Sequence, residues 1–193
     1  PRGDNRMALL LHICCAPCSI MCVETLRAEG LEPTGFWENP NIHPYTEYRA
    51  RKNALVDYAK QIRLPLVVHG EYGLRPFVGE VAADIDGRCA KCYALRMRAC
   101  AAYAAQNGFA QFTSTLFVSP YQNHELLKGT AESAAREFGV EFLYRDFRPY
   151  FREGQERARA LELYMQKYCG CIFSEEERYR KRPKPAAPQK EEK

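Results

Sequence analysis

The sequence lacks any apolar run of about 18 residues, the length that a membrane-spanning helix needs, so we expect no membrane partner. It also has little excess charge. Its 28 basic and 24 acidic residues leave a net charge of +4, which permits a polyanionic partner but does not require one. The stretch MALLLHICC lacks the length and the small-residue cleavage site of a secretory signal. We therefore expect a cytoplasmic protein.

Disulfides are also not expected, although the chain has nine cysteines. The odd number rules out complete pairing, and nothing in the sequence directs the chain to an oxidising compartment. The adjacent Cys14 and Cys15 would pair only with strain. The thiols are therefore expected to be reduced, either as metal ligands or as small buried apolar groups.

Apolar runs and helical periodicities alternate along the chain of 193 residues, which is long enough to bury a core. The predicted strands span residues 8–13, 32–39, 64–70, 109–118 and 140–147. The predicted helices span about 17–29, 45–62, 74–86, 89–106, 124–138 and 155–166. This alternation predicts an α/β fold with a doubly wound parallel sheet, in which ligands bind beyond the carboxyl ends of the strands. We expect an extension at residues 1–6, one domain at 7–181 and a disordered tail at 182–193.

The cysteines form three patches: residues 14, 15, 18 and 22; residues 89, 92 and 100; and residues 169 and 171. Cys22 and Cys100 lie within predicted helices beside apolar neighbours, so we expect both in the core. The other seven lie at turns, at a helix start or around a glycine, where packing does not explain them. One zinc site needs four ligands. Seven thiols therefore indicate two metal centres, or one centre plus redox chemistry, and their spacing leaves zinc and iron–sulfur open.

Five blocks carry a family resemblance: HICCAPCS, NPNIHPYTEY, RCAKCYALR, STLFVSPYQN and YMQKYCGCIFS. Together they resemble the cobalamin-independent epoxyqueuosine reductases of the QueH type, in order over about residues 7–179. The resemblance implies an oxidoreductase for the last step of queuosine biosynthesis. Such an enzyme reduces the epoxide of epoxyqueuosine, at the wobble position of tRNA, to an alkene. It implies tRNA and an electron donor of unknown identity as partners, and no cobalamin.

The resemblance also implies a Rossmann-like fold similar to the adenine nucleotide alpha-hydrolase-like group. Nucleotide-activating members of that group carry a glycine-rich phosphate loop after the first strand. Here CCAPC occupies that turn, so we expect a metal there and no ATP. The implied cofactors are a [4Fe–4S] cluster and a second, mononuclear metal. In some members an Asp is among the ligands of that metal, and Cys18 is the matching position here. An all-thiolate set would admit zinc as well as iron.

Ligand roles follow from the resemblance and from local geometry. Neighbouring residues of an extended chain point to opposite sides, so we expect Cys14 and Cys15 to serve different centres. The same division is open to the pair formed by Cys169 and Cys171. We expect Cys89 and Cys92 to join one member of each pair on the cluster, and the remaining thiols to hold the single metal with Cys18.

Three residues in or beside the loop motifs are candidates for the catalytic proton donor: His43, Glu47 and Tyr121. Each also has a simpler explanation, because His43 can cap a helix, Glu47 can be an exposed acid of a first helical turn and Tyr121 can pack.

For the RNA, aromatic side chains can stack on splayed bases and basic side chains can contact phosphates. Among the RNA-binding candidates we favour Arg88 and Arg96, which flank the C-x-x-C motif, together with Tyr48. Trp37 and Arg51 are further candidates for stacking and for phosphate contact, respectively.

Two other functions compete with a reductase. A non-catalytic, zinc-stabilised RNA-binding module would unfold on chelation and bind tRNA without turnover. A thiol–disulfide oxidoreductase would use Cys89 and Cys92, but the thioredoxin-like context of such a motif is missing.

Overall fold

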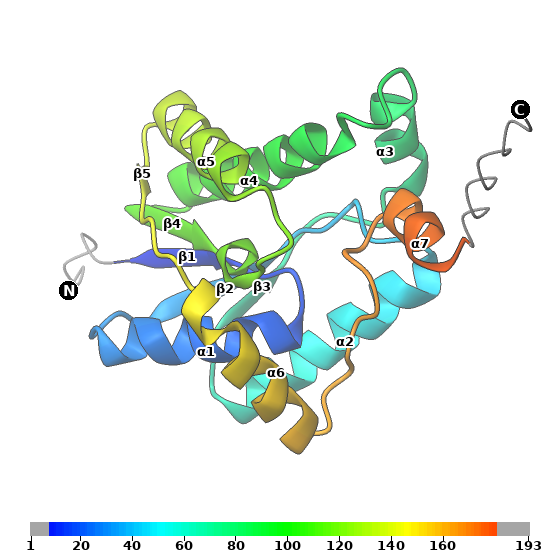
Figure 1. Ribbon diagram of the computed structural model, residues 1–193. Helices are drawn as coiled ribbons and strands as arrows, with labels where there is room; N and C mark the ends of the chain where they lie inside the picture. Colours follow the sequence, from blue (N-terminus) through cyan, green and yellow to red (C-terminus); the bar gives the residue numbers. More distant parts are fainter. Residues whose placement is uncertain (1–7, 181–193) are drawn as a thin grey trace, which may run out of the picture.

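The computed structural model describes residues 8–180, which form five strands, seven α-helices and two 3₁₀ turns (Figure 1). In chain order these are β1 (Leu9–His12), α1 (Ala16–Ala28), β2 (Pro33–Trp37), α2 (Tyr45–Gln61), β3 (Leu66–Val68), α3 (Leu74–Val81), α4 (Arg88–Gln106), β4 (Gln111–Ser114), η2 (Thr115–Val118), α5 (His124–Phe138), β5 (Glu141–Phe142), η3 (Arg148–Tyr150), α6 (Phe151–Ala160) and α7 (Ile172–Tyr179). Our predicted boundaries of the extension and the tail lie outside the described residues. Within residues 8–180, no helix combines the length and hydropathy that a bilayer crossing requires.

The sheet is entirely parallel, with the strand order β3-β2-β1-β4-β5. From β1 the chain adds β2 and then β3 on one side of the sheet. It then crosses back and adds β4 and β5 on the other side of β1. This reversal puts the topological switch point between β1 and β4, where doubly wound folds bind ligands. His12 is in register with Ser114 at the carboxyl ends of these two strands. The predicted α/β, Rossmann-like fold is confirmed.

Helices cover both faces of the sheet (Figure 1). On one side α1 contacts both α2 and α6, and on the other α4 packs against α5, β1 and β4. The central strand β1 is therefore enclosed from both directions, and its leucines are fully buried. This enclosure explains why residues 9–11 are uninterrupted leucine rather than an alternation of apolar and polar residues.

Local chemistry sets several helix ends. The N-cap of α5 is Asn123, whose side chain accepts a hydrogen bond from the N–H of Leu126. The same helix stops at Gly139, which has a left-handed φ of 67° and confirms the predicted end.

Several predicted elements have different bounds in the structure. The strand expected over 64–70 is only Leu66–Val68, and the helix expected over 74–86 ends at Val81. The strand expected over 109–118 ends at Ser114, because that hydroxyl accepts the N–H of Leu116 and the chain turns into η2. The strand expected over 140–147 is only Glu141–Phe142, at the edge of the sheet. The helix expected over 155–166 is α6, which ends at Ala160, and Glu162 then takes a positive φ of 52°. An irregular segment of turns and bends follows and leads to α7, which the sequence analysis does not predict.

Candidate metal centre

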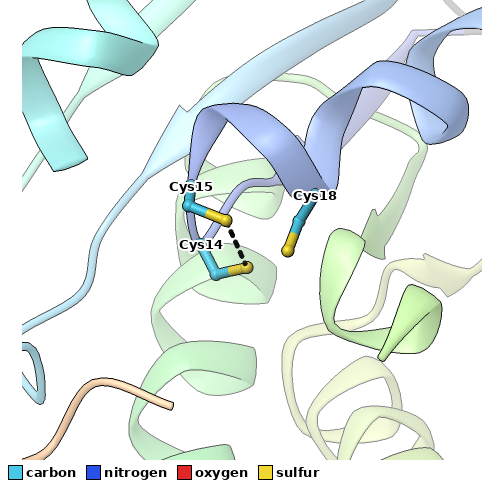
Figure 2. Close-up of side chains that lie close together, drawn as sticks. All are labelled: Cys14, Cys15 and Cys18. Atoms are coloured by element: carbon cyan, nitrogen blue, oxygen red, sulfur yellow. Dashed lines mark hydrogen bonds between the residues drawn. The ribbon is translucent and has the colours of Figure 1, made fainter. Parts of the chain in front are cut away.

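Three sulfur atoms meet at the switch point, in the turn from β1 to α1 (Figure 2). The Sγ atoms of Cys14, Cys15 and Cys18 all lie within 4.8 Å of one another. Cys15 is the N-cap of α1. Pro17 and Cys18 both lie in the first turn of this helix, which places Cys18 close to the end of β1. We call these three residues the thiol triad. Their spacing suits a single thiophilic metal with one coordination position left open.

The prediction that Cys14 and Cys15 point to opposite sides is wrong. Figure 2 shows the two side chains converging, and their sulfurs are 3.8 Å apart. Side chains alternate only while the chain continues as a strand, and β1 ends at His12. The closeness of the sulfurs removes the geometric reason for assigning the two thiols to different centres.

Residues distant in sequence fix the triad. The hydroxyl of Thr115, at the end of β4, accepts the backbone N–H of Cys14 at 3.1 Å and donates to its sulfur at 3.4 Å. From the segment before α7, Nε2 of Gln166 lies 3.0 Å from the sulfur of Cys15 and 3.6 Å from that of Cys18. Both residues fall inside the sequence blocks of the family resemblance, yet neither was among our predicted site residues.

The three thiols hold their protons unequally. Hydrogen bonds from Cys15 and Cys18 lower the pKa of Cys14 well below its ordinary value. Burial raises the pKa of Cys15, and the bond to the Cys14 sulfur raises that of Cys18. Of the three, Cys14 is therefore the thiol that loses its proton most readily, and metal binding releases the protons that the triad still holds.

Four more thiols line a second cavity of about 450 Å³. We call them the thiol quartet: Cys89 and Cys92 from the first turn of α4, and Cys169 and Cys171 from the loop before α7. Cys171 is the N-cap of α7, and its sulfur accepts the N–H of Ser174 at 3.4 Å. Burial raises the pKa of Cys92 to about 12, so this thiol is protonated at neutral pH unless it binds a metal.

The triad and the quartet adjoin. Cys14 and Cys18 line a larger cavity of about 620 Å³, and Cys169 lines this cavity as well as the smaller one. Tyr121 and Gln122 are also shared between the two cavities. Three cysteine patches that are far apart in the sequence are therefore brought to one region of the molecule.

A buried ion pair on α2, formed by Arg51 and Glu47, holds the segment that carries Cys169 and Cys171. We call this segment, residues 168–171, the quartet loop. Arg51 is 1% exposed, and its guanidinium donates to the carbonyls of Tyr168 at 3.0 Å and Cys169 at 2.9 Å. Glu47 accepts the Nε of Arg51 at 2.6 Å and also accepts the hydroxyl of Tyr164. In Figure 1 the orange segment from α6 to α7 runs beside α2, where these bonds are made.

The sequence makes Arg51 a candidate for phosphate contact. The structure makes it a positioning residue, and its i, i+4 spacing from Glu47 was the available signal.

Replacing Arg51 with glutamine is expected to destabilise the fold by about 3–5 kcal/mol, because the Glu47 carboxylate stays buried without its cation. Thermal or denaturant unfolding of the metal-free chain measures this loss. Arg49→Gln is the matched control, since Arg49 is exposed on the same helix and should change stability little. Equal stability of the two variants would contradict the role of Arg51.

The three proton-donor candidates occupy different surroundings. His43 is fully buried and lines neither cavity: its Nε2 donates to the carbonyl of Pro40 at 3.0 Å, and its Nδ1 accepts the N–H of Ile172 at 3.3 Å. Burial lowers the pKa of His43, which fits this neutral ring. The Glu47 carboxylate is held in the buried ion pair with Arg51. Tyr121 is 84% exposed and lines both cavities, so only this candidate faces the thiol region.

The RNA-binding candidates differ in whether their side chains can be reached from solvent. Arg88 lines the smaller cavity and pairs with Glu177 at 2.6 Å. Arg96 is 2% exposed and Tyr48 is 4% exposed, so in this structure neither side chain is available to a phosphate or a base. Trp37, a further stacking candidate, is fully buried. The prediction that Cys22 and Cys100 belong to the core is confirmed, because both are 0% exposed among apolar residues.

The chain is similar in sequence to proteins of one known family over most of its length. The sequence model of the family described as epoxyqueuosine reductase QueH matches residues 9–177. A protein of that name from Dehalococcoides mccartyi is 38% identical, with 92% of this chain and 98% of the relative covered. Its counterpart from Haemophilus influenzae is 33% identical over 90% of this chain and 73% of the relative. The Thermotoga maritima protein is 31% identical over 90% and 93%, respectively.

Proposed function

The chain belongs to the epoxyqueuosine reductase QueH family, and from this premise we propose that it reduces epoxyqueuosine in tRNA to queuosine. In this reaction two electrons and two protons enter, both carbon–oxygen bonds of the epoxide break, an alkene forms and the oxygen leaves as water. The observation that carries the proposal is the convergence of seven thiols around two adjoining cavities.

The donor set suits the two inorganic groups that the proposal needs. Every residue of the triad and the quartet offers a thiolate, the ligand that iron–sulfur clusters and thiophilic single metals prefer. We propose that Cys89 and Cys92 hold a [4Fe–4S] cluster, that Cys18 holds a mononuclear iron, and that Cys14, Cys15, Cys169 and Cys171 complete the two sites. When bound, the cluster supplies electrons and the single metal acts as a Lewis acid toward the epoxide oxygen.

The larger cavity is the proposed place of the modified base. Its volume of about 620 Å³ suits a nucleoside flipped out of the anticodon loop, and the triad forms part of its lining. Tyr168 from the quartet loop and the exposed ring of Tyr121 offer aromatic surfaces. We propose that the Tyr121 hydroxyl delivers a proton to the departing oxygen, because Tyr121 is the proton-donor candidate that faces the cavity.

Basic side chains at the cavity rim are placed to contact the RNA backbone. Arg159 from α6, Lys167 before the quartet loop and Arg178 from α7 all line this cavity and are exposed. Because they come from three different segments, they can contact several phosphates on one side of the flipped nucleotide.

The test is anaerobic incubation of iron- and sulfide-reconstituted protein with epoxyqueuosine-containing tRNA and a chemical reductant, followed by mass analysis of the nucleosides. The expected product has lost one oxygen atom, and the protein's visible absorption should bleach on reduction. A colourless protein that carries only zinc after anaerobic purification, and binds tRNA without turnover, would instead support the non-catalytic zinc module.

A further inference from the structure

Arg96 is a buried cation whose partners include a predicted metal ligand. It lies on α4 one turn after Cys92 and is 2% exposed. Its Nη2 donates to the sulfur of Cys92 at 3.1 Å, and its Nε donates to the Cys92 carbonyl at 3.4 Å. A guanidinium stays protonated in proteins, so this side chain brings a full positive charge into the interior.

No carboxylate balances this charge. Within residues 8–180 no acidic side chain forms an ion pair with Arg96, whereas the equally buried Arg51 is paired with Glu47. A buried ion without a counter-charge costs several kcal/mol. The sulfur of Cys92 faces this side chain, and it becomes a negative partner when metal binding removes its proton.

The thiols near Arg96 belong to both groups. The guanidinium interacts electrostatically with Cys92 and Cys169 of the quartet and with Cys14 of the triad. It also acts on His12, the last residue of β1 and the neighbour of the triad turn. Arg96 thus contacts the quartet through Cys92 and acts electrostatically on Cys14 of the triad, and both sites acquire negative charge when their thiols bind a metal.

We propose that Arg96 is the counter-cation shared by the triad and the quartet, a positioning residue that stabilises the negative charge of the metal-loaded thiolates. This inference rests on the proposed function and extends it. A cation and N–H···S bonds next to a cluster favour its more negative, reduced form, so Arg96 raises the reduction potential of the cluster. It also favours metal uptake, because exchanging thiol protons for a divalent metal makes a four-thiolate site more negative.

The redox test compares cluster midpoint potentials by anaerobic titration followed by electron paramagnetic resonance. Arg96→Gln should lower the potential most, and Arg96→Lys should lower it less because the charge remains. The control is Arg98→Gln, since Arg98 is exposed on the same helix and pairs with Glu137. Equal potentials in Arg96→Gln and Arg98→Gln would overturn the proposal. If Arg96→Gln takes up no cluster while Arg98→Gln does, the loss supports the role of Arg96 in metal uptake; loss of the cluster in both variants would overturn it.

A second measurement separates this inference from the proposed reaction. Co²⁺ titration of the metal-free chain, followed by its thiolate absorption, reports affinity without any iron–sulfur chemistry. Arg96→Gln should weaken Co²⁺ binding by about 10- to 100-fold, the usual effect of losing a group that supports metal ligands, and Arg98→Gln should not. Unchanged Co²⁺ affinity overturns the proposal for Arg96. A wild-type chain that binds Co²⁺ in this way but never assembles a cluster refutes the proposed function instead.

Discussion

Replacing Cys92 with alanine is expected to abolish the proposed iron–sulfur cluster and to slow the proposed reduction of epoxyqueuosine by about a thousandfold or more. Cys92 is 7% exposed and lines the smaller cavity, so no water or neighbouring side chain can readily substitute for its sulfur. The substitution also leaves the Arg96 guanidinium buried without the thiolate that faces it. Iron and sulfide analysis, visible absorption and the anaerobic turnover assay measure the result.

Cys100→Ala is the matched control on the same helix. Cys100 is 0% exposed and packs in the apolar core two turns beyond Cys92. Its loss should cost about 1 kcal/mol of stability through the small cavity that is left, and should change neither cluster content nor turnover. A Cys92→Ala protein with full iron content would sink the assignment, as would loss of the cluster in both variants.

Replacing Cys18 with alanine is expected to remove the proposed mononuclear metal and turnover while leaving the proposed cluster in place. Cys18 comes from the first turn of α1, and its sulfur completes the triad. Metal analysis should show a loss confined to the mononuclear site, with the resonance signal of the reduced cluster retained. Cys18→Asp should keep the metal, because a carboxylate is also a good iron ligand and the family resemblance implies Asp at this position in some members.

The control for this experiment is Cys22→Ala, one turn further along α1. Cys22 is 0% exposed and is not part of the triad, so metal content and turnover should match the wild type. Retention of both metals by Cys18→Ala would show that the triad does not hold the mononuclear metal. Loss of the cluster together with the single metal would show that Cys18 serves the cluster.

Local sequence was sufficient to predict most of the fold. The apolar run before Cys14 predicted a buried central strand, and Gly139 marked the end of α5. Expectations were less accurate where a single contact decides the outcome. The β4 strand ends early because the Ser114 hydroxyl caps η2, and residues 161–171 form an irregular segment of turns and bends rather than a longer helix.

The sequence alone separated the seven cysteines of the candidate site from Cys22 and Cys100, because thiols at turns and helix starts differ from thiols within apolar helix faces. Only the tertiary structure decided which thiols lie together and what charges surround them. Cys14 is bonded to Thr115 across 101 positions, and that contact depends on β4 pairing beside β1. The sequence makes Arg96 and Tyr48 candidates for RNA contact, yet the packing of α4 and α2 buries both. Local patterns report the preferences of neighbouring residues, whereas strand order and helix packing set the distances between residues far apart in the chain.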